Sequence, residues 1–233
     1  MSDILLVHGA WHGGWCWRHV ADRLRAGGMR VLTPTLTGLG ERAHLLSPET
    51  GLALHLADLL AVIRCEGLEK ATIVGHSYGA MPAALACQSG AIARFVSLDG
   101  VALEPGRALA DDVPKEQRRA AEAMLIDGLA LPAPPPETFD VPADHPAHGW
   151  ALARTSPMPW KCLTDPFPAF PGRFRDLPRA YVAAARNSMA GPARGLAQAR
   201  TLGWQVETID SGHDLPLTAP EATAEMIARL ARA

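Results

Sequence analysis

The sequence predicts an α/β domain in which about six mostly parallel strands carry helices on both faces. Short apolar runs of strand length alternate with longer segments whose apolar residues recur at helical spacing, and this alternation is typical of parallel sheets. The 233-residue chain is long enough for one sizeable core, and its 48% hydrophobic and 20% charged residues are typical of globular proteins.

Each predicted strand is a short apolar run of the kind that a buried parallel strand needs. The runs lie at residues 4–9, 29–34, 71–77, 94–99, 179–186 and 204–209. The predicted helices lie between or after these strands, at residues 17–26, 50–66, 80–87 and 220–231. Gly27 and Gly67 follow the first two helices directly, where a glycine suits the end of a helix.

One long stretch interrupts the alternation. Residues 103–178 contain most of the chain's 20 prolines, and the proline-rich run that begins at Leu131 suits neither a helix interior nor a central strand. A helix is predicted within this stretch at residues 115–129, and several aromatic residues argue against a disordered linker. We therefore predict an insertion that covers one end of the sheet and divides the core into residues 1–102 and 179–233.

Residues 75–79 read Gly-His-Ser-Tyr-Gly, a G-x-S-x-G motif between a predicted strand and a predicted helix. Such a turn lifts the serine out of the sheet and places a helix N-terminus beneath it. A side chain at either glycine would collide with neighbouring backbone in so sharp a bend. The context therefore predicts Ser77 as a nucleophile and not as a solvated serine in a plain glycine-rich loop.

A serine nucleophile that transfers an acyl group needs a base, which should follow it in sequence on a loop after the last strand. His213 is the histidine in that position. Backbone N–H groups should bind the developing oxyanion, one from Tyr78 and a second from Ala10 in the glycine-rich loop after the first strand. That loop lacks the glycine pattern of a phosphate-binding loop.

Three stretches carry a family resemblance. The string from Leu6 to Trp17 contains H-G-A-x-H-G-G-W-x-W, and it resembles the α/β-hydrolases grouped around plant methyl-ester hydrolases and hydroxynitrile lyases. The G-H-S-Y-G motif and the S-P-M-P-W-K-C-L-T-D-P-F stretch inside the insertion are similar to the same group, and the similarity runs nearly the whole length. The resemblance implies an α/β-hydrolase sheet that starts at its third standard strand. It also implies a cap between the sixth and seventh standard strands and the site roles given above.

The acid that orients the base departs from the pattern of this family. It usually follows the seventh strand, where this chain has Asn187, and an asparagine cannot stabilise an imidazolium by charge. The other known placement follows the sixth strand and corresponds to Asp99. We predict Asp99 as the acid and keep Asn187 as the alternative histidine-orienting residue. Asp210 and Asp214 are less suitable because they lie so close to His213 in sequence.

The leading functional hypothesis is a serine hydrolase that cleaves a carboxylic ester or lactone with an apolar or aromatic acyl group through an acyl-enzyme. Trp11, Met158 and Trp160 are predicted to contribute to the pocket for this small-molecule substrate. Hydroxynitrile lyase-type C–C cleavage is one alternative, although the lyases usually carry threonine where Gly9 stands and lysine where Asp214 stands. A non-catalytic ligand-binding relative is the other.

Composition and residue spacing indicate which cofactors and partners are not expected. A formal net charge of -2 gives no reason to expect nucleic acid, and no apolar run is long enough to span a bilayer. The histidines and cysteines lack metal-ligand spacing, so we expect no metal and no other cofactor. The four separated cysteines and an N-terminal segment without a basic region predict a cytoplasmic protein. Whether the chain forms a homodimer stays open.

Overall fold

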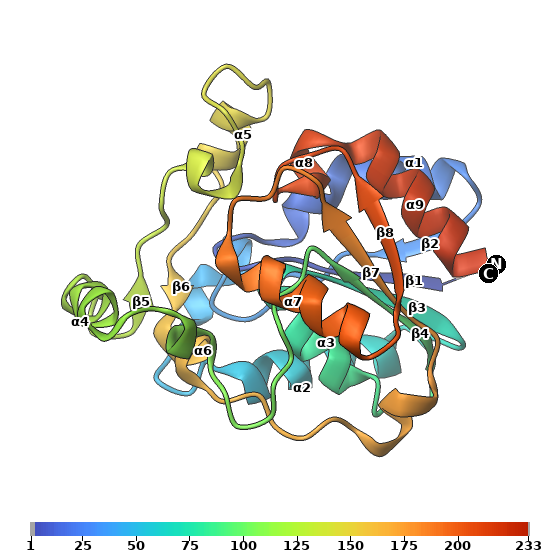
Figure 1. Cartoon of the computed structure of the whole chain (residues 1–233), viewed down its shortest axis with the longest axis horizontal. Coiled ribbons are helices and arrows are strands. Elements are labelled where there is room, and N and C mark those ends of the chain that lie inside the picture. Colours follow the sequence, from blue (N-terminus) through green and yellow to red (C-terminus); the bar gives the residue numbers. More distant parts are fainter. Residues whose placement is uncertain (1–2, 233) are drawn as a thin grey trace.

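A six-stranded parallel sheet forms the centre of the computed structural model, with strand order β2-β1-β3-β4-β7-β8 (Figure 1). The structure describes residues 3–232, so the two ends of the predicted domain division, residues 1–2 and 233, lie outside the described residues. The strands are β1 (Asp3–Val7), β2 (Arg30–Leu32), β3 (Ala71–His76), β4 (Ile92–Leu98), β7 (Arg179–Ala184) and β8 (Gln205–Ile209). The predicted parallel α/β architecture is confirmed.

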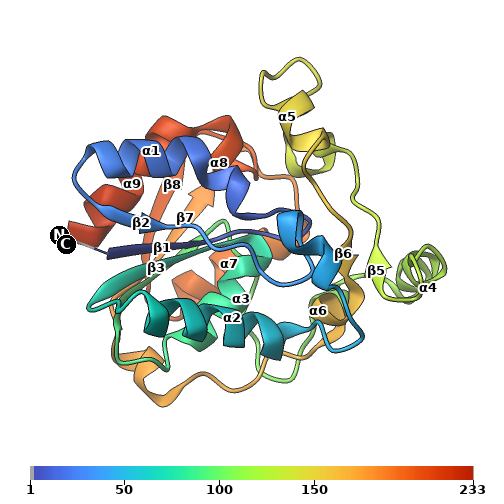
Figure 2. The same ribbon diagram turned by 180° about the vertical axis from the view of Figure 1, so that it is seen from behind.

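Helices cover both faces of this sheet, as Figures 1 and 2 show from opposite sides. The helices on one face are α1 (Arg18–Ala26), α8 (Leu215–Thr218) and α9 (Pro220–Arg232). Those on the other face are α2 (Leu52–Cys65), α3 (Ala80–Ala86) and α7 (Ala190–Thr201). Short 3-10 helices precede several of them, among them η1 (Gly14–Trp17), η2 (Gly40–Leu45) and η3 (Ser77–Gly79).

The central strands separate two apolar cores because successive side chains of a strand point to opposite faces. In β1, Leu5 and Val7 belong to the core that includes residues of α2, α3 and α7. Ile4 and Leu6 belong to the core that includes residues of α1 and α9. Burial on both faces explains why the sequence of this strand is a continuous apolar run rather than an alternating one.

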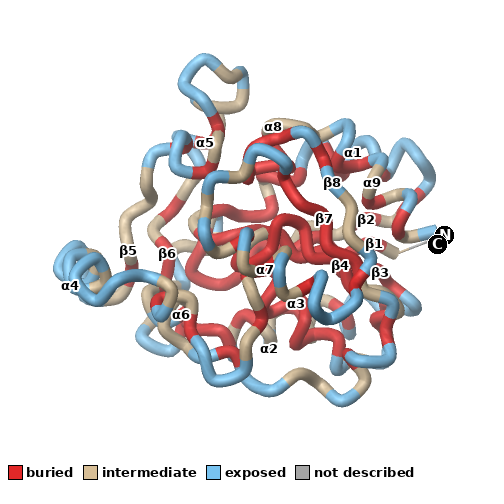
Figure 3. The backbone as a smooth tube through the Cα atoms, in the orientation of Figure 1, coloured by how far each residue is buried: buried red, intermediate tan, exposed pale blue. Residues whose placement is uncertain are grey.

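The chain between β4 and β7, which holds the predicted cap segment (residues 103–178), lies mainly at the end of the sheet where the parallel strands terminate (Figure 1). Its elements are η4 (Leu109–Asp112), α4 (Lys115–Ala123), β5 (Ala130–Leu131), η5 (Pro136–Phe139), α5 (His148–Leu152), β6 (Met158–Pro159), α6 (Trp160–Thr164) and η6 (Gly172–Asp176). β5 and β6 form a small antiparallel pair. Figure 3 shows α4 as an exposed element and the strands as the buried centre. The division into core and cap stays a prediction.

The last part of this segment packs against the main core. The Phe174 ring lies 5.2 Å from the Phe95 ring of β4 and 6.0 Å from the Trp204 ring, and all three side chains are buried. Aromatic residues in this stretch therefore anchor the return of the chain from the end of the sheet to β7.

Two helices differ from the expectation. The helix expected at residues 115–129 ends at Ala123, because the chain reverses at Asp127 and Gly128, which have φ angles of 50° and 68°. No helix was expected at α7, where glycines and a proline lower helix propensity. A Cβ on Gly195 would lie 2.1 Å from the carbonyl oxygen of Gly100, so close packing requires this glycine.

Candidate active site

Ser77 lies on the tight turn η3 between β3 and α3, with a φ angle of 52°. This left-handed backbone is uncommon for a residue other than glycine. A Cβ on Gly75 would lie 2.5 Å from the carbonyl oxygen of Gly79, and a Cβ on Gly79 would lie 2.4 Å from that of His8. Both glycines of the motif are therefore required by close backbone approach.

The Ser77 hydroxyl opens a chain of two hydrogen bonds. His213 Nε2 lies 3.0 Å from Ser77 Oγ, and His213 Nδ1 lies 2.7 Å from Asp99 Oδ2. Because a carboxylate only accepts, Nδ1 carries the proton and Nε2 is left to accept from the serine hydroxyl. The structure thus brings together the three residues that the sequence predicted as nucleophile, base and acid.

Asp99 follows β4 directly and is 2% exposed. Its other oxygen, Oδ1, accepts a hydrogen bond of 3.1 Å from the backbone N–H of Ala184, at the end of the neighbouring strand β7. Asp99 has a φ angle of 40° and Trp11 one of 62°, so unusual backbone occurs at several points around Ser77.

The alternative orienting residue, Asn187, makes different contacts. Its amide nitrogen donates to the carbonyl oxygen of Met189 at 3.1 Å, and its amide oxygen accepts from the N–H of the same residue at 2.9 Å. Both polar atoms of the side chain are therefore engaged in a local turn at the start of α7. The structure brings Asp99, and not Asn187, to the ring of His213.

A cavity of about 440 Å³ opens at Ser77. Ala10 and Tyr78, the predicted oxyanion donors, line it together with Trp11 and Trp160. Residues of η4 and α7, most of them apolar, form much of the remaining wall, and α4 contributes Gln117, Arg118 and Ala121. Met158, the third predicted pocket residue, is fully buried in the core and does not line this cavity. Met189 lines it instead, and no motif had singled this residue out.

A second, much smaller hollow lies on the His213 side of Ser77. Its volume is about 20 Å³, and its walls include Trp11, His12, Phe139 and Met189. A space of this size accommodates about one water-sized group. The two sides of Ser77 therefore differ strongly in the size of the group that they can hold.

Tyr78 is held by a buried histidine. His55 Nε2–H donates to the carbonyl oxygen of Thr37 at 2.8 Å, so its Nδ1 is free to accept the Tyr78 hydroxyl, also at 2.8 Å. Burial lowers the pKa of His55, which favours the neutral ring that this arrangement needs. The thiol of Cys162 lies 3.6 Å from His55 Nδ1. Sequence reasoning missed this support, because nothing in the local pattern around His55 links it to residue 78.

Two further neutral histidines tie the loops around Ser77. His8 accepts the N–H of Leu36 at Nε2, at 3.0 Å, and His76 donates from Nε2 to the carbonyl oxygen of His213, at 2.9 Å. Burial lowers the pKa of each of these two rings to about 3. Both therefore remain uncharged at neutral pH.

His12 and Asp214 form a buried ion pair between the two loops of the site. His12 Nε2 lies 3.0 Å from Asp214 Oδ2, and His12 Nδ1 lies 2.7 Å from the carbonyl oxygen of Ala10. Burial alone lowers the pKa of His12, but the charge and hydrogen bond of Asp214 outweigh it and raise that pKa. Burial alone raises the pKa of Asp214, and the charge of His12 brings it below its ordinary value. The loop with Ala10 is thereby fastened to the loop with His213.

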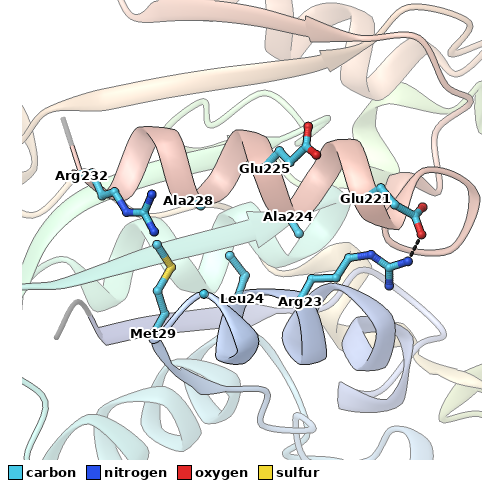
Figure 4. A pocket seen from close by; sticks show the side chains of 9 residues that line it. Arg23, Leu24, Met29, Glu221, Ala224, Glu225, Ala228 and Arg232 are labelled. Carbon is cyan, nitrogen blue, oxygen red and sulfur yellow. Dashed lines mark ion pairs between the residues drawn. The ribbon is translucent and has the colours of Figure 1, made fainter.

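Another hollow lies away from Ser77. It lies between α1 and α9, has a volume of about 280 Å³ and contains none of the candidate site residues (Figure 4). Arg23 and Glu221 form an ion pair at one end of it, and Arg232 lies at the other.

Within residues 3–232, no helix is long and apolar enough to cross a membrane, and no group of three or more His, Cys, Asp or Glu side chains is arranged to hold a metal ion. The expectation of no metal or cofactor stays a prediction.

Comparison with known proteins places this geometry in a family. Residues 4–226 match the model of the alpha/beta hydrolase family. The chain belongs to this family. The carbendazim hydrolyzing esterase of Nocardioides sp. (strain SG-4G) is 36% identical to this α/β-hydrolase over 244 residues, which cover 99% of this chain and 100% of that protein. Methylesterase 10 of Arabidopsis thaliana is 36% identical over 91 residues, or 38% of this chain and 32% of that protein.

A solved structure supports the fold over the full length of the α/β-hydrolase. An extracellular alpha/beta-hydrolase from a Paenibacillus species, described as sharing homology with tobacco salicylic acid binding protein 2, has a TM-score of 0.84 and 22% identity, with 100% of both chains covered. The resemblance predicted from the sequence is confirmed, and so is the enzyme class, a carboxylic ester hydrolase. The serine mechanism, the acyl group and the cellular location stay predictions.

Proposed function

We propose that this α/β-hydrolase is a serine esterase that cleaves esters between a bulky apolar or aromatic acid and a small alcohol. The observation that carries the proposal is the hydrogen-bonded chain from Ser77 through His213 to Asp99, in which Ser77 lines the mainly apolar cavity. A nucleophile, a base and an orienting carboxylate in this order perform acyl transfer on several unrelated folds.

In the proposed mechanism, Ser77 Oγ attacks the ester carbonyl carbon while His213 Nε2 takes the hydroxyl proton. Asp99 holds the ring and stabilises the imidazolium that forms. The N–H groups of Ala10 and Tyr78 bind the oxyanion. His213 then gives the proton to the leaving alcohol, and afterwards activates a water molecule that hydrolyses the acyl-enzyme.

The unequal spaces beside Ser77 support the substrate class. The leaving oxygen must receive its proton from His213, so the alcohol lies on the His213 side, where the hollow measures about 20 Å³. The acyl group then occupies the apolar cavity of about 440 Å³. The small hollow suits both methanol in acylation and water in deacylation. A lactone fits less well, because its alcohol remains attached to the acyl chain.

A pair of isomeric esters tests this assignment. Methyl 2-naphthylacetate carries the large group on the acyl side, whereas 2-naphthylmethyl acetate carries it on the alcohol side, and neither alcohol is activated. We expect kcat/KM to favour the methyl ester by about 10-fold or more. Equal rates, or a preference for the acetate, would contradict the assignment of the two spaces. The similarity to the Nocardioides enzyme makes carbendazim a third compound to assay.

The serine mechanism has its own test. Ser77→Ala should lower kcat on the methyl ester by about 10³-fold or more, the scale observed when a member of such a triad is removed. An aryl phosphonate should label the wild-type chain once, at Ser77, and leave the variant unlabelled. A variant that retains more than about a tenth of wild-type turnover excludes Ser77 as the nucleophile.

A further inference from the structure

The loop that carries His213 is held from outside the sheet by the predicted cap segment. The backbone N–H of His213 donates to Asp140 Oδ2 at 3.0 Å, and the N–H of Asp214 donates to the carbonyl oxygen of Phe139 at 3.1 Å. Two consecutive amides of the histidine loop are thus bound by two consecutive residues that lie more than 70 positions earlier in the chain. Neither residue belongs to a recognisable sequence motif.

Hydrogen bonding and burial fix the turn that provides these acceptors. Asp140 has a φ angle of 60° and ends η5, and its own N–H donates to the carbonyl oxygen of Glu137 at 3.1 Å. Phe139 and Val141 on either side of it are buried. The Phe139 ring lies 5.5 Å from the Trp11 ring, in the loop that carries the predicted oxyanion donor Ala10. The turn therefore contacts both loops that flank Ser77.

The contact between the two segments is close on both sides. A Cβ on Gly212 would lie 2.3 Å from the Cβ of Asp140, so the approach of Asp140 depends on a glycine next to His213. Ser188 donates its hydroxyl to Asp140 Oδ1 at 3.0 Å, which fixes the carboxylate while Oδ2 accepts from His213. A backbone N–H bonded to a carboxylate makes a stronger hydrogen bond than a neutral pair does.

We infer that Asp140 is a positioning residue for His213, an inference that rests on the proposed serine mechanism. The ring of His213 must stay within hydrogen-bond distance of Ser77 and Asp99 at the same time, and the backbone nitrogen at the base of that side chain is the point that Asp140 holds. A displacement of about 1 Å in a catalytic group is enough to lower a rate by about 100-fold. The segment between β4 and β7 therefore does more than cover the substrate: it sets the position of the base.

Two substitutions at residue 140 separate positioning from stability. Asp140→Gly removes the carboxylate and tolerates the positive φ angle, whereas Asp140→Asn tolerates the same backbone and keeps an oxygen that can accept from His213. We expect kcat on methyl 2-naphthylacetate to fall by about 10- to 100-fold in the glycine variant, with KM within about twofold. The asparagine variant should stay within about threefold of wild-type kcat.

The rates are expressed per active site, counted by complete labelling with the phosphonate. If Asp140 only stabilises the fold, the glycine variant has fewer labelled sites but an unchanged kcat per site, and the inference is wrong. An asparagine variant as slow as the glycine variant also overturns it, because the acceptor oxygen would then not matter. Failure of the proposed mechanism is recognised separately, by turnover that persists in Ser77→Ala.

Discussion

Replacing Asp99 with asparagine tests which nitrogen of His213 carries the proton. In the structure, Asp99 Oδ2 accepts from His213 Nδ1 at 2.7 Å and Oδ1 accepts from the Ala184 N–H at 3.1 Å. An asparagine has one acceptor oxygen, and the backbone N–H of Ala184 can only donate. The oxygen should therefore stay with Ala184, and the amide NH₂ should face His213 Nδ1.

This orientation reverses the proton arrangement of the ring. Nδ1 must present its lone pair to the NH₂ group, so the proton moves to Nε2, which lies 3.0 Å from Ser77 Oγ. A protonated Nε2 donates to the serine and cannot take its proton. We expect kcat to fall by about 10³- to 10⁴-fold, the scale for a triad with the wrong tautomer. This corresponds to about 4–5.5 kcal/mol of lost transition-state stabilisation.

The assay compares initial rates on methyl 2-naphthylacetate per phosphonate-labelled site. Asn187→Ala is the matched control and should remain within about twofold of wild type, since its side chain bonds only the backbone of Met189. Thermal unfolding of the Asp99→Asn variant checks that its fold is intact. Asp99 does not set the tautomer of His213 if this variant keeps more than about a tenth of wild-type kcat, or if the Asn187 variant is the slower of the two.

Two further predictions concern stability. His12→Leu leaves the carboxylate of Asp214 buried without its partner, and urea unfolding should show a loss of about 3–5 kcal/mol. The pKa of His12 is raised and that of Asp214 is lowered, so the stability difference between wild type and variant should be largest between their ordinary pKa values, 6.5 and 3.8. It should decline as pH rises through the folded pKa of His12 or falls through that of Asp214. A stability difference that is independent of pH would contradict a charged pair. Gly79→Ala places a Cβ 2.4 Å from the carbonyl oxygen of His8 and should cost about 3 kcal/mol in the same assay. Gly149→Ala, which meets nothing within 4 Å, is the control, and equal stability of the two variants would show that the close approach is unimportant.

Strands were the most predictable part of the fold. Each of the six lies within or overlaps its predicted range. The four inner strands were the clearest, because a parallel strand covered on both faces is apolar along most of its length. α7 was missed because Pro192 and Gly195 lower helix propensity, while packing against the chain after β4 requires a small residue there. Local sequence describes propensity, whereas the need for space at Gly195 comes from a segment about 95 residues away.

Some residues of the candidate site were also more predictable from the sequence than others. Ser77 and His213 were predictable because a nucleophile turn and a histidine loop leave local marks in the sequence. The sequence favoured Asp99 for its charge but kept Asn187 as the alternative, since both follow strands that end at the same edge of the sheet. The structure brings the Asp99 carboxylate to His213 and turns the Asn187 amide to Met189, although the role of Asp99 in catalysis stays a prediction.

The sequence by itself determined the parallel α/β core, the family and the turn that presents Ser77, because burial on both faces and a sharp glycine-flanked bend restrict which residues can stand at each position. Only the tertiary structure decided what surrounds that turn. The His12–Asp214 pair and the contact of Asp140 with His213 each join segments far apart in the chain. These contacts depend on which segments the fold brings close together, and a local sequence pattern does not contain that distance.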